Sequence, residues 1–307
     1  MMDDKRRSTR VLLGQDNNSL INLVAVNVIL FLILKFLFLV YQISDSDMSA
    51  YYRNVFNWFT LPADLSKLST RPWTVLTHMF VHEDFFHLFA NTLWLWMYGY
   101  ILQEMAGNRK LIPIYLYGGL TSAFLYILSY HIFPQLQGSL STAAFFGANA
   151  SLMAVAIATT TVSPDYRIFP MINGGIPLWV LTVIYVILNF IFIPSRDAAM
   201  YIANVGGASL GFLFIYQMRK GNDWSVWMNA FFDWAKDLFN PDKKSNNRKT
   251  KDEFFYKVKG SQPFKKTPHI TQQRIDRILD KINQEGYHFL TDEEKDVLKR
   301  AANDGDL

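Results

Sequence analysis

The stretch LINLVAVNVILFLILKFLFLVYQI, residues 20–43, contains a single charged residue, Lys35. An apolar helix of about 20 residues is long enough to cross the hydrocarbon core of a bilayer, so this stretch predicts a membrane span. A cleaved signal peptide is the alternative. We favour the span, because the apolar run is too long for the hydrophobic region of a signal peptide and the residues after it offer no small-residue cleavage site.

Five further apolar segments follow, and glycine, proline or charged residues bound each of them. They cover residues 86–105, 111–133, 147–163, 177–194 and 199–217. The fourth and sixth spans are short and rich in small residues, which predicts positions inside the bundle rather than facing lipid. The sequence therefore predicts an all-α polytopic membrane protein with a six-helix domain over residues 20–217.

Composition narrows the chemistry of the 307-residue chain. It contains no cysteine, which excludes disulfide scaffolds, thiolate metal sites, iron–sulfur clusters and cysteine nucleophiles. Half of its residues are hydrophobic, too many for a disordered chain. The net charge of +4 arises at the N-terminus and in the tail, so we expect no nucleic-acid partner. No motif calls for a cofactor or a metal.

The distribution of basic residues predicts the topology. Lys and Arg occur before the first span, between spans two and three (Arg109 and Lys110) and directly after span six (Arg219 and Lys220), whereas the loop 131–146 has none. Basic loops stay in the cytoplasm. Both termini are therefore predicted to be cytoplasmic, and the loop 44–85 to be outside. In a bacterium the protein would lie in the inner or plasma membrane.

Polar segments flank the membrane domain. Residues 1–19 are predicted to be a cytoplasmic N-terminal segment, and 241–270 a lysine-rich linker that anionic lipids attract. Residues 218–240, between the membrane domain and this linker, are predicted to form an amphipathic helix. Its apolar face comprises Trp224, Trp227, Met228, Phe231, Trp234, Ala235 and Leu238. Two interpretations stay open: a helix lying in the membrane interface, or one packed under the bundle.

Residues 271–307 are predicted to form a small helical hairpin. Its first helix carries one apolar stripe and ends at Gly286, and Thr291 with Glu294 forms a capping box for the second. The stripe consists of Ile275, Ile278, Leu279 and Ile282. The hairpin buries too little for a catalytic domain, so we expect an interaction module that binds a cytoplasmic protein through 271–301.

Several polar residues lie where an apolar helix is expected, which is costly in a bilayer. His78, His82, His87 and Asn91 cluster at the outer entry to span two. A zinc site is the competing interpretation, but His82 and His87 are five residues apart rather than four and so occupy different helix faces. His87 and Asn91 do share a face that can point into the bundle.

Spans four and six carry complementary small residues. Ala150, Ala154 and Ala158 recur every four residues in span four, and Gly207 with Gly211 forms a GxxxG pair in span six. The two spans run in the same direction, so their small faces are predicted to pack together. This packing would bring Asn149 and Asn204 to a similar depth. Two interpretations stay open: the two amides hydrogen-bond to each other and so join the helices (helix glue), or they occupy a converted active site.

Three stretches together resemble the core of the rhomboid family of intramembrane serine proteases. They are RPWTVLTHMFVHEDFFHLFANTLWLW (71–96), FFGANASLMAVAIA (145–158) and IANVGGASLGFLF (202–214). The resemblance implies a six-transmembrane-helix rhomboid-like bundle with a cytoplasmic helical tail. It also implies that His87 and Asn91 correspond to the oxyanion-stabilising residues of the family.

The resemblance places Asn149 at the nucleophile position and Asn204 at the general-base position. Gly147 matches the first glycine of the Gly-x-Ser-Gly motif, and Ala150 replaces its second. The Trp-Arg pair of the first outer loop reads Trp73-Thr74. An amide has no ionisable proton to lose near pH 7 and does not act as a base there.

The sequence therefore predicts a catalytically inactive rhomboid that binds transmembrane segments of client proteins and contacts membrane lipids. One alternative is an active intramembrane endopeptidase that uses a non-standard site, with His87 as base. Ser151 is a poor substitute nucleophile, because it lies about 200° around the helix from Asn149. A transporter or channel is the third alternative, disfavoured because the spans carry few ionisable residues and the chain shows neither an internal repeat nor a charged pathway.

Overall fold

The computed structural model describes residues 18–44, 47–168, 174–192, 197–238 and 272–303. The chain divides into two compact units, residues 1–240 and 241–307, and we describe each by itself. The predicted linker 241–270 and nearly all of the predicted N-terminal segment 1–19 lie outside the described residues.

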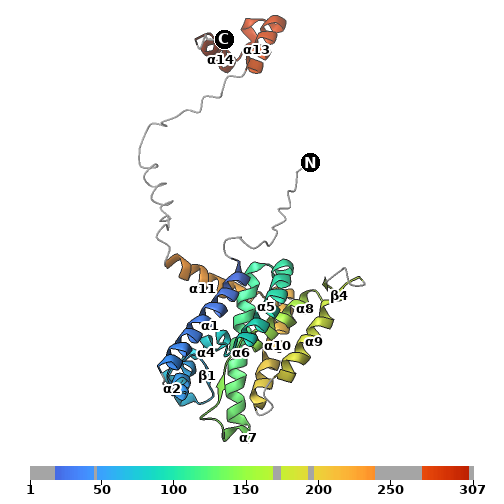
Figure 1. The fold of residues 1–307 in the computed structure, drawn as a ribbon. Helices are drawn as coiled ribbons and strands as arrows, with labels where there is room; N and C mark the ends of the chain where they lie inside the picture. The colour runs from blue at the N-terminus through green and yellow to red at the C-terminus, as the bar shows by residue number, and fades with distance from the viewer. Residues whose placement is uncertain (1–17, 45–46, 169–173, 193–196, 239–271, 304–307) are drawn as a thin grey trace. The chain divides into compact units, whose positions relative to one another are not determined.

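Each of the six predicted segments forms a helix (Figure 1). These helices are α1 (Ser19–Ile43), α5 (Phe85–Ala106), α6 (Asn108–Ile132), α8 (Asn149–Val162), α9 (Leu178–Phe192) and α10 (Ala198–Arg219). The all-α prediction is confirmed. Among the described residues, α1, α6 and α10 are long and apolar enough to cross a bilayer. The count of six spans stays a prediction.

Helix α8 is the centre of the bundle and packs against α5, α6 and α10. Every residue from Ala150 to Ala156 is buried. Close approach of α10 depends on glycine: a Cβ on Gly207 would lie 2.3 Å from the Ala150 carbonyl oxygen, and one on Gly211 would lie 2.1 Å from that of Ala154. The predicted packing of the two small faces is confirmed.

The prediction that span six is a short interior helix is only half right. Helix α10 is 22 residues long, and its glycine face is buried while the opposite face, with Val205, Phe212 and Leu213, is exposed. The small residues of α10 line only the face that packs against α8. The opposite face of the same helix carries large apolar side chains of the kind that face lipid.

The connection between α1 and α5 contains structure that the sequence analysis missed. It holds α2 (Met48–Asn54), η1 (Phe56–Trp58), β1 (Leu61–Pro62), α3 (Leu65–Thr70), α4 (Thr74–Thr77) and η2 (His78–Phe80). The connection after α6 holds α7 (Pro134–Gln137) and β2 (Ala144–Phe145). Strands β1 and β2 pair antiparallel, Leu61 with Phe145, so the two connections are joined at the end of the bundle remote from α11 (Figure 1).

A second strand pair and one more helix complete this unit. Strands β3 (Arg167–Ile168) and β4 (Ile176–Pro177) pair antiparallel between α8 and α9. Helix α11 (Ser225–Leu238) follows α10 and contacts the start of α6, where Lys110 pairs with Asp223. Met228 is buried, whereas Trp227, Phe231, Trp234 and Leu238 are exposed. The face predicted as one stripe is thus divided between the bundle and an open surface.

The second unit is the predicted helical hairpin, α13 (Gln272–Glu285), η3 (Tyr287–Phe289) and α14 (Asp292–Asn303). Ile278, Leu290 and Val297 form its small core. Thr291 and Glu294 make the reciprocal hydrogen bonds of a capping box: the Thr291 N–H donates to Glu294 Oε2 at 2.8 Å, and the Glu294 N–H donates to Thr291 Oγ1 at 3.3 Å. Gly286, at φ +93°, ends the first helix.

Candidate functional site

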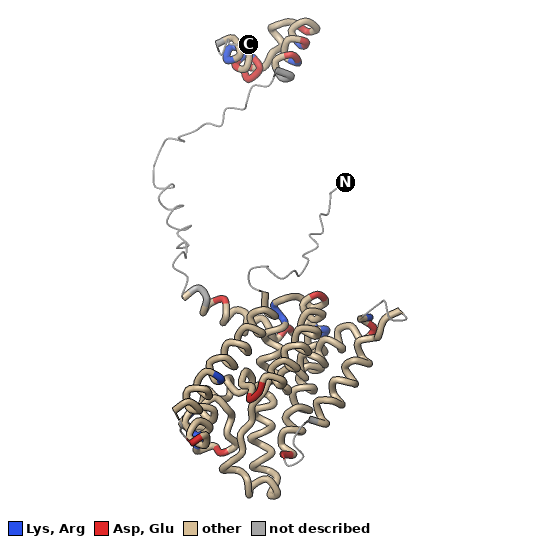
Figure 2. The backbone as a smooth tube through the Cα atoms, in the orientation of Figure 1, with Lys and Arg blue, Asp and Glu red and all other residues tan. Residues whose placement is uncertain are grey.

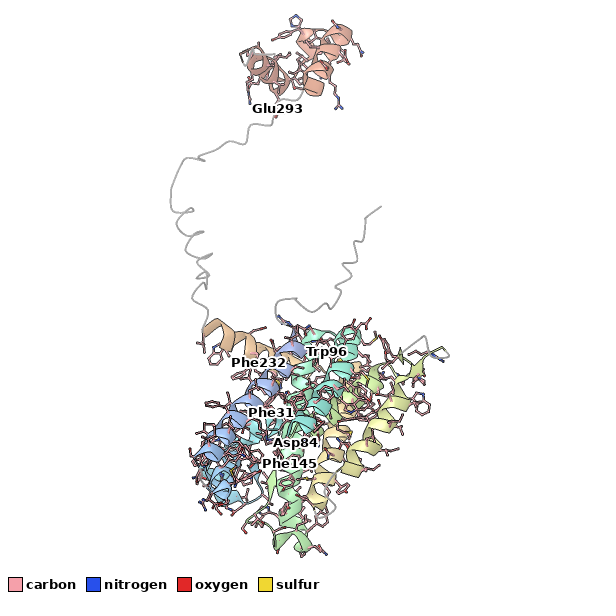
Figure 3. All side chains as sticks on the ribbon, in the orientation of Figure 1. Phe31, Asp84, Trp96, Phe145, Phe232 and Glu293 are labelled. Carbon is pink, nitrogen blue, oxygen red and sulfur yellow. The ribbon has the colours of Figure 1, made fainter. Side chains whose placement is uncertain are left out.

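Two helix starts meet at the candidate site. Asp84 caps α5 by accepting a hydrogen bond from the His87 N–H at 2.8 Å, which fixes His87 in the first turn. Asn149 is the first residue of α8, just after β2. Figure 3 labels Asp84 and Phe145, which mark the two incoming segments. The His87 imidazole and the Asn149 amide are both half-buried, and His87 Nε2 lies 3.3 Å from Asn149 Oδ1.

Gly147 makes this contact possible. Its φ of +105° turns the chain from β2 into α8, a conformation that residues with a side chain rarely adopt. A Cβ at this position would also lie 2.9 Å from His87 Cε1. The Gly147 N–H donates to the His78 carbonyl at 2.9 Å, which ties the turn to the connection before α5. Glycine is therefore required for both backbone geometry and space.

Asn91 is buried and its amide nitrogen is engaged by a histidine that the sequence analysis did not assign to it. His82 Nδ1 lies 3.2 Å from the Phe80 carbonyl, and Asn91 Nδ2 lies 3.2 Å from His82 Nε2. A carbonyl only accepts and an amide nitrogen only donates, so His82 carries its proton on Nδ1 and accepts at Nε2. Its ring also stands edge-on to His87, with centroids 5.0 Å apart.

The two buried histidines of the connection before α5 are uncharged. Burial lowers the pKa of His78 to about 4. Burial, with a smaller contribution from the neighbouring His87, lowers the pKa of His82 to about 3. Both rings are therefore neutral at pH 7, which agrees with the single-proton arrangement that the hydrogen bonds of His82 require.

Asn204 lies on α10 at the level of the site. Gly207 abuts Ala150 and Gly211 abuts Ala154, so one turn earlier α10 passes the start of α8. Asn204 is 2% exposed, and its Oδ1 has no hydrogen-bond partner among the described residues. The helix-glue interpretation needs a bond between the two amides, but Asn149 Oδ1 faces His87 instead. That interpretation is wrong for this structure.

Two further residues bear on catalysis: Ser151, the possible substitute nucleophile, and Thr74, which occupies the position of the family's arginine. Ser151 is 1% exposed and points toward α6, where a Cβ on Gly119 would lie 2.6 Å from its Oγ. It is thus sealed between two helices, away from Asn149. Thr74, at the position of the expected arginine, is fully buried and donates its hydroxyl to the Arg71 carbonyl at 2.8 Å.

The arrangement offers hydrogen-bond donors but no activated nucleophile. The first N–H groups of α8 have no intrahelical acceptors and carry a partial positive charge. Together with His87 they can bind a peptide carbonyl oxygen. Within the described residues, no three His, Cys, Asp or Glu side chains gather in a group that could hold a metal ion. The side chains that meet at the two helix starts, His87 and Asn149, are an imidazole and an amide, and no hydroxyl lies at their contact.

Comparison with known proteins gives two family matches. The model of the rhomboid domain matches residues 69–221. A family of unknown function, DUF6576, matches residues 263–304, which include the helical hairpin.

Three curated relatives are all named as rhomboid proteases. GluP of Bacillus subtilis is 30% identical over 108 residues, 34% of this chain and 20% of that protein. GlpG of Klebsiella pneumoniae is 32% identical over 68 residues, 22% of this chain and 24% of that protein. GlpG of Salmonella newport is 32% identical over 73 residues, 24% of this chain and 26% of that protein. The chain therefore matches between 20% and 26% of the relatives' own length.

Proposed function

The chain belongs to the rhomboid family, and we propose that it is a catalytically inactive member, a pseudoprotease that binds transmembrane segments of client proteins. One observation carries the proposal. The side chain that reaches His87 from the start of α8 is the amide of Asn149, with its Oδ1 at 3.3 Å from Nε2. Proteolysis by the family's route needs a hydroxyl there and a base to deprotonate it.

The base position supports the same conclusion. Asn204 is an amide in an environment almost closed to solvent, and an amide does not accept a proton in the useful pH range. His87, Asn91 and the N-terminus of α8 remain as oxyanion-type groups. Without a nucleophile and a base, such groups give weak residual catalysis at best. They can still donate hydrogen bonds to a bound carbonyl.

The binding role follows from the donors and acceptors left at the site. A transmembrane segment that unwinds exposes N–H and C=O groups that lipid does not satisfy. The N–H groups of α8 and the imidazole of His87 supply donors for such carbonyls. The buried Asn204 Oδ1, without a partner among the described residues, supplies an acceptor for an N–H. Clients with helix-breaking residues in their spans are therefore the preferred ligands.

We further propose six spans with both termini in the cytoplasm. Lysines and arginines at the start of α6 and the end of α10 support this orientation, and charged residues are sparse between the ends of the bundle helices (Figure 2). The linker 241–270 would then meet anionic lipids, and 271–301 a cytoplasmic protein partner. Because the chain lacks cysteine, single cysteines at Ser141 and Asn222 report the topology: an impermeant maleimide should label intact cells only at Ser141.

An active endopeptidase is the second candidate. The observation in its favour is that an imidazole, that of His87, already contacts residue 149. This candidate lacks a hydroxyl at that contact, and Ser151 is sealed against α6.

A fluorophosphonate probe and a peptide-binding assay separate the two candidates. The purified protein in lipid nanodiscs should stay unlabelled by the probe. It should bind a synthetic transmembrane peptide with a central Gly-Pro pair more tightly than an all-leucine counterpart. The Asn149→Ser/Asn204→His variant restores both groups and is the matched positive control for labelling.

Binding is checked with Asn204→Leu, which removes the buried acceptor and should lower affinity for the Gly-Pro peptide about tenfold. Covalent labelling of a serine in the wild-type protein would refute the inactive assignment. Equal affinity for the two peptides would refute recognition of unwound segments.

A further inference from the structure

A pocket of about 370 Å³ is lined by residues of the two connections that β1 and β2 join. Three cationic residues line it, Arg53, Lys67 and Arg71, together with the hydroxyl residues Thr60 and Ser141 and their neighbours. None of its lining residues, all of which the structure describes, is acidic. We call it the basic pocket. It is distinct from the site of His87 and Asn149.

Two of the three cations of the basic pocket, Lys67 and Arg71, are held in place by hydrogen bonds to carbonyl groups rather than by ion pairs. Lys67 Nζ donates to the Ser141 carbonyl, and the Arg71 guanidinium donates to the Asn57 carbonyl at 2.5 Å. Within the described part of the chain, neither side chain forms an ion pair, and Arg53 forms none either. Lys67 and Arg71 are half-buried, so their charges are only partly hydrated. Partly desolvated, preoriented cations favour a bound anion.

Two carboxylates, those of Asp47 and Asp64, interact electrostatically with Arg53 and Lys67 but form their hydrogen bonds with serines. Asp47 accepts hydrogen bonds from Ser49, and Asp64 accepts them from Ser66. These bonds, with smaller contributions from Arg53 and Lys67, hold the pKa of each carboxyl below its usual value. The ionised aspartates offset part of the charge of Arg53 and Lys67 from outside the pocket, since neither of them lines it, and the lining itself contains three cationic residues and no acidic one.

Two exposed tryptophans, Trp58 and Trp73, lie beside this pocket and contact one of its cations. The rings of Trp58 and Trp73 stack with centroids 5.9 Å apart, and Trp73 Nε1 donates to the Trp58 carbonyl at 2.9 Å. Both side chains are exposed, Trp58 to 46% and Trp73 to 43%. The Arg71 guanidinium lies 5.8 Å from the centre of the Trp58 ring. Exposed indoles concentrate at headgroup level, and Arg71 links them directly to the pocket.

We propose that the basic pocket binds the phosphate of an anionic phospholipid headgroup. Lys and Arg recognise phosphate through charge-assisted hydrogen bonds, and Thr60 and Ser141 offer hydroxyls to the remaining oxygens. A lipid source fits the headgroup depth that Trp58 and Trp73 mark. The bound lipid would clamp together the two connections that flank the pocket. This inference goes beyond the proposed function and does not depend on whether the protein is inactive.

The test measures ligand-induced stabilisation of the full-length protein in a neutral detergent. Thermal unfolding is followed while dihexanoylphosphatidylglycerol, dihexanoylphosphatidylcholine or inorganic phosphate is added. A ligand that binds only the folded state raises the melting temperature with its concentration. The anionic lipid should raise it at the lowest concentration. The Arg53→Gln/Lys67→Gln variant should need at least about ten times more of it. Arg71 is left unchanged because its guanidinium both donates to the Asn57 carbonyl and lies against the Trp58 ring, whereas the Lys67 side chain makes one hydrogen bond among the described residues, to the Ser141 carbonyl.

The matched control is Arg167→Gln, which removes one cation from β3, outside the basic pocket, and should respond like the wild type. Lys67→Gln alone is measured in parallel, so that the test does not rest on the folding of the double variant. Equal stabilisation by the zwitterionic lipid would refute recognition of an anionic headgroup. An unchanged response of both pocket variants would refute the pocket itself. Inorganic phosphate acting as strongly as the anionic lipid would identify the ligand as free phosphate and refute the lipid source.

Discussion

The Gly211→Ala substitution tests the contact that places α10 against α8. The added Cβ would lie 2.1 Å from the Ala154 carbonyl oxygen, so α10 must retreat by about 1.3 Å to reach the ordinary contact distance of 3.4 Å. Overpacking of this kind costs about 1–3 kcal/mol. A backbone carbonyl inside a helix has no room to move aside, which favours the upper end. Alanine regains about 1 kcal/mol of helix propensity. The expected net loss is about 2 kcal/mol.

The matched control is Gly206→Ala on the same helix. Its Cβ would meet Leu125 Cδ1 at 2.2 Å, but Leu125 is half-exposed and its side chain is free to rotate away. This variant should therefore keep or slightly raise the stability. Thermal unfolding in nanodiscs, followed by tryptophan fluorescence, should show the melting temperature of Gly211→Ala lower by roughly 4–8 °C. Equal melting temperatures for the two variants would refute the argument that backbone contact sets the spacing of α8 and α10.

Three further predictions follow from particular residues. The pKa of His82 is about 3 in the folded protein and 6.5 in the unfolded chain. As the pH falls below 6.5, the unfolded chain therefore binds a proton at His82 while the folded protein does not. The contribution of His82 should lower the free energy of unfolding by about 2 kcal/mol between pH 6.5 and pH 5. The His82→Gln variant should show a weaker pH dependence of the free energy of unfolding, whereas the exposed-site control His131→Gln should show the same dependence as the wild type. Chemical denaturation at each pH measures both. Gly147→Ala should cost about 2 kcal/mol or more through its φ of +105° and the clash with His87; an unchanged midpoint of denaturation would contradict this. Thr291→Ala removes a cap worth about 1 kcal/mol, so the amides of α14 should exchange hydrogen about fivefold faster, while an equal rate would show that the cap is dispensable.

The sequence predicted the helices well because each is encoded locally. The apolar run around Lys35 predicted α1, and the boundaries at Gly107 and Asp197 coincide with the ends of α5 and the cap of α10. The capping box at Thr291 was equally local. Short elements were missed: the β1–β2 pairing depends on residues more than 80 positions apart, which no periodicity reveals.

For the candidate site, the sequence named residues and the structure adds the contacts that they make. Helical spacing put His87 and Asn91 on one face, and the motif put Asn149 at the start of α8. The sequence did not predict that Asn91 binds His82, that Asn149 faces His87 rather than Asn204, or that Arg71 reaches a pocket.

The sequence by itself thus determined the class of protein, the helices and their small-residue faces. Apolar runs and caps act within one segment, so they can be read without knowing its neighbours. Only the tertiary structure decided which polar groups meet. Periodicity fixes the direction of a side chain about its own helix axis, whereas a hydrogen bond also depends on how far the facing helix is shifted and rotated. That shift is set here by glycine contacts between α8 and α10, and it exists only in the packed bundle.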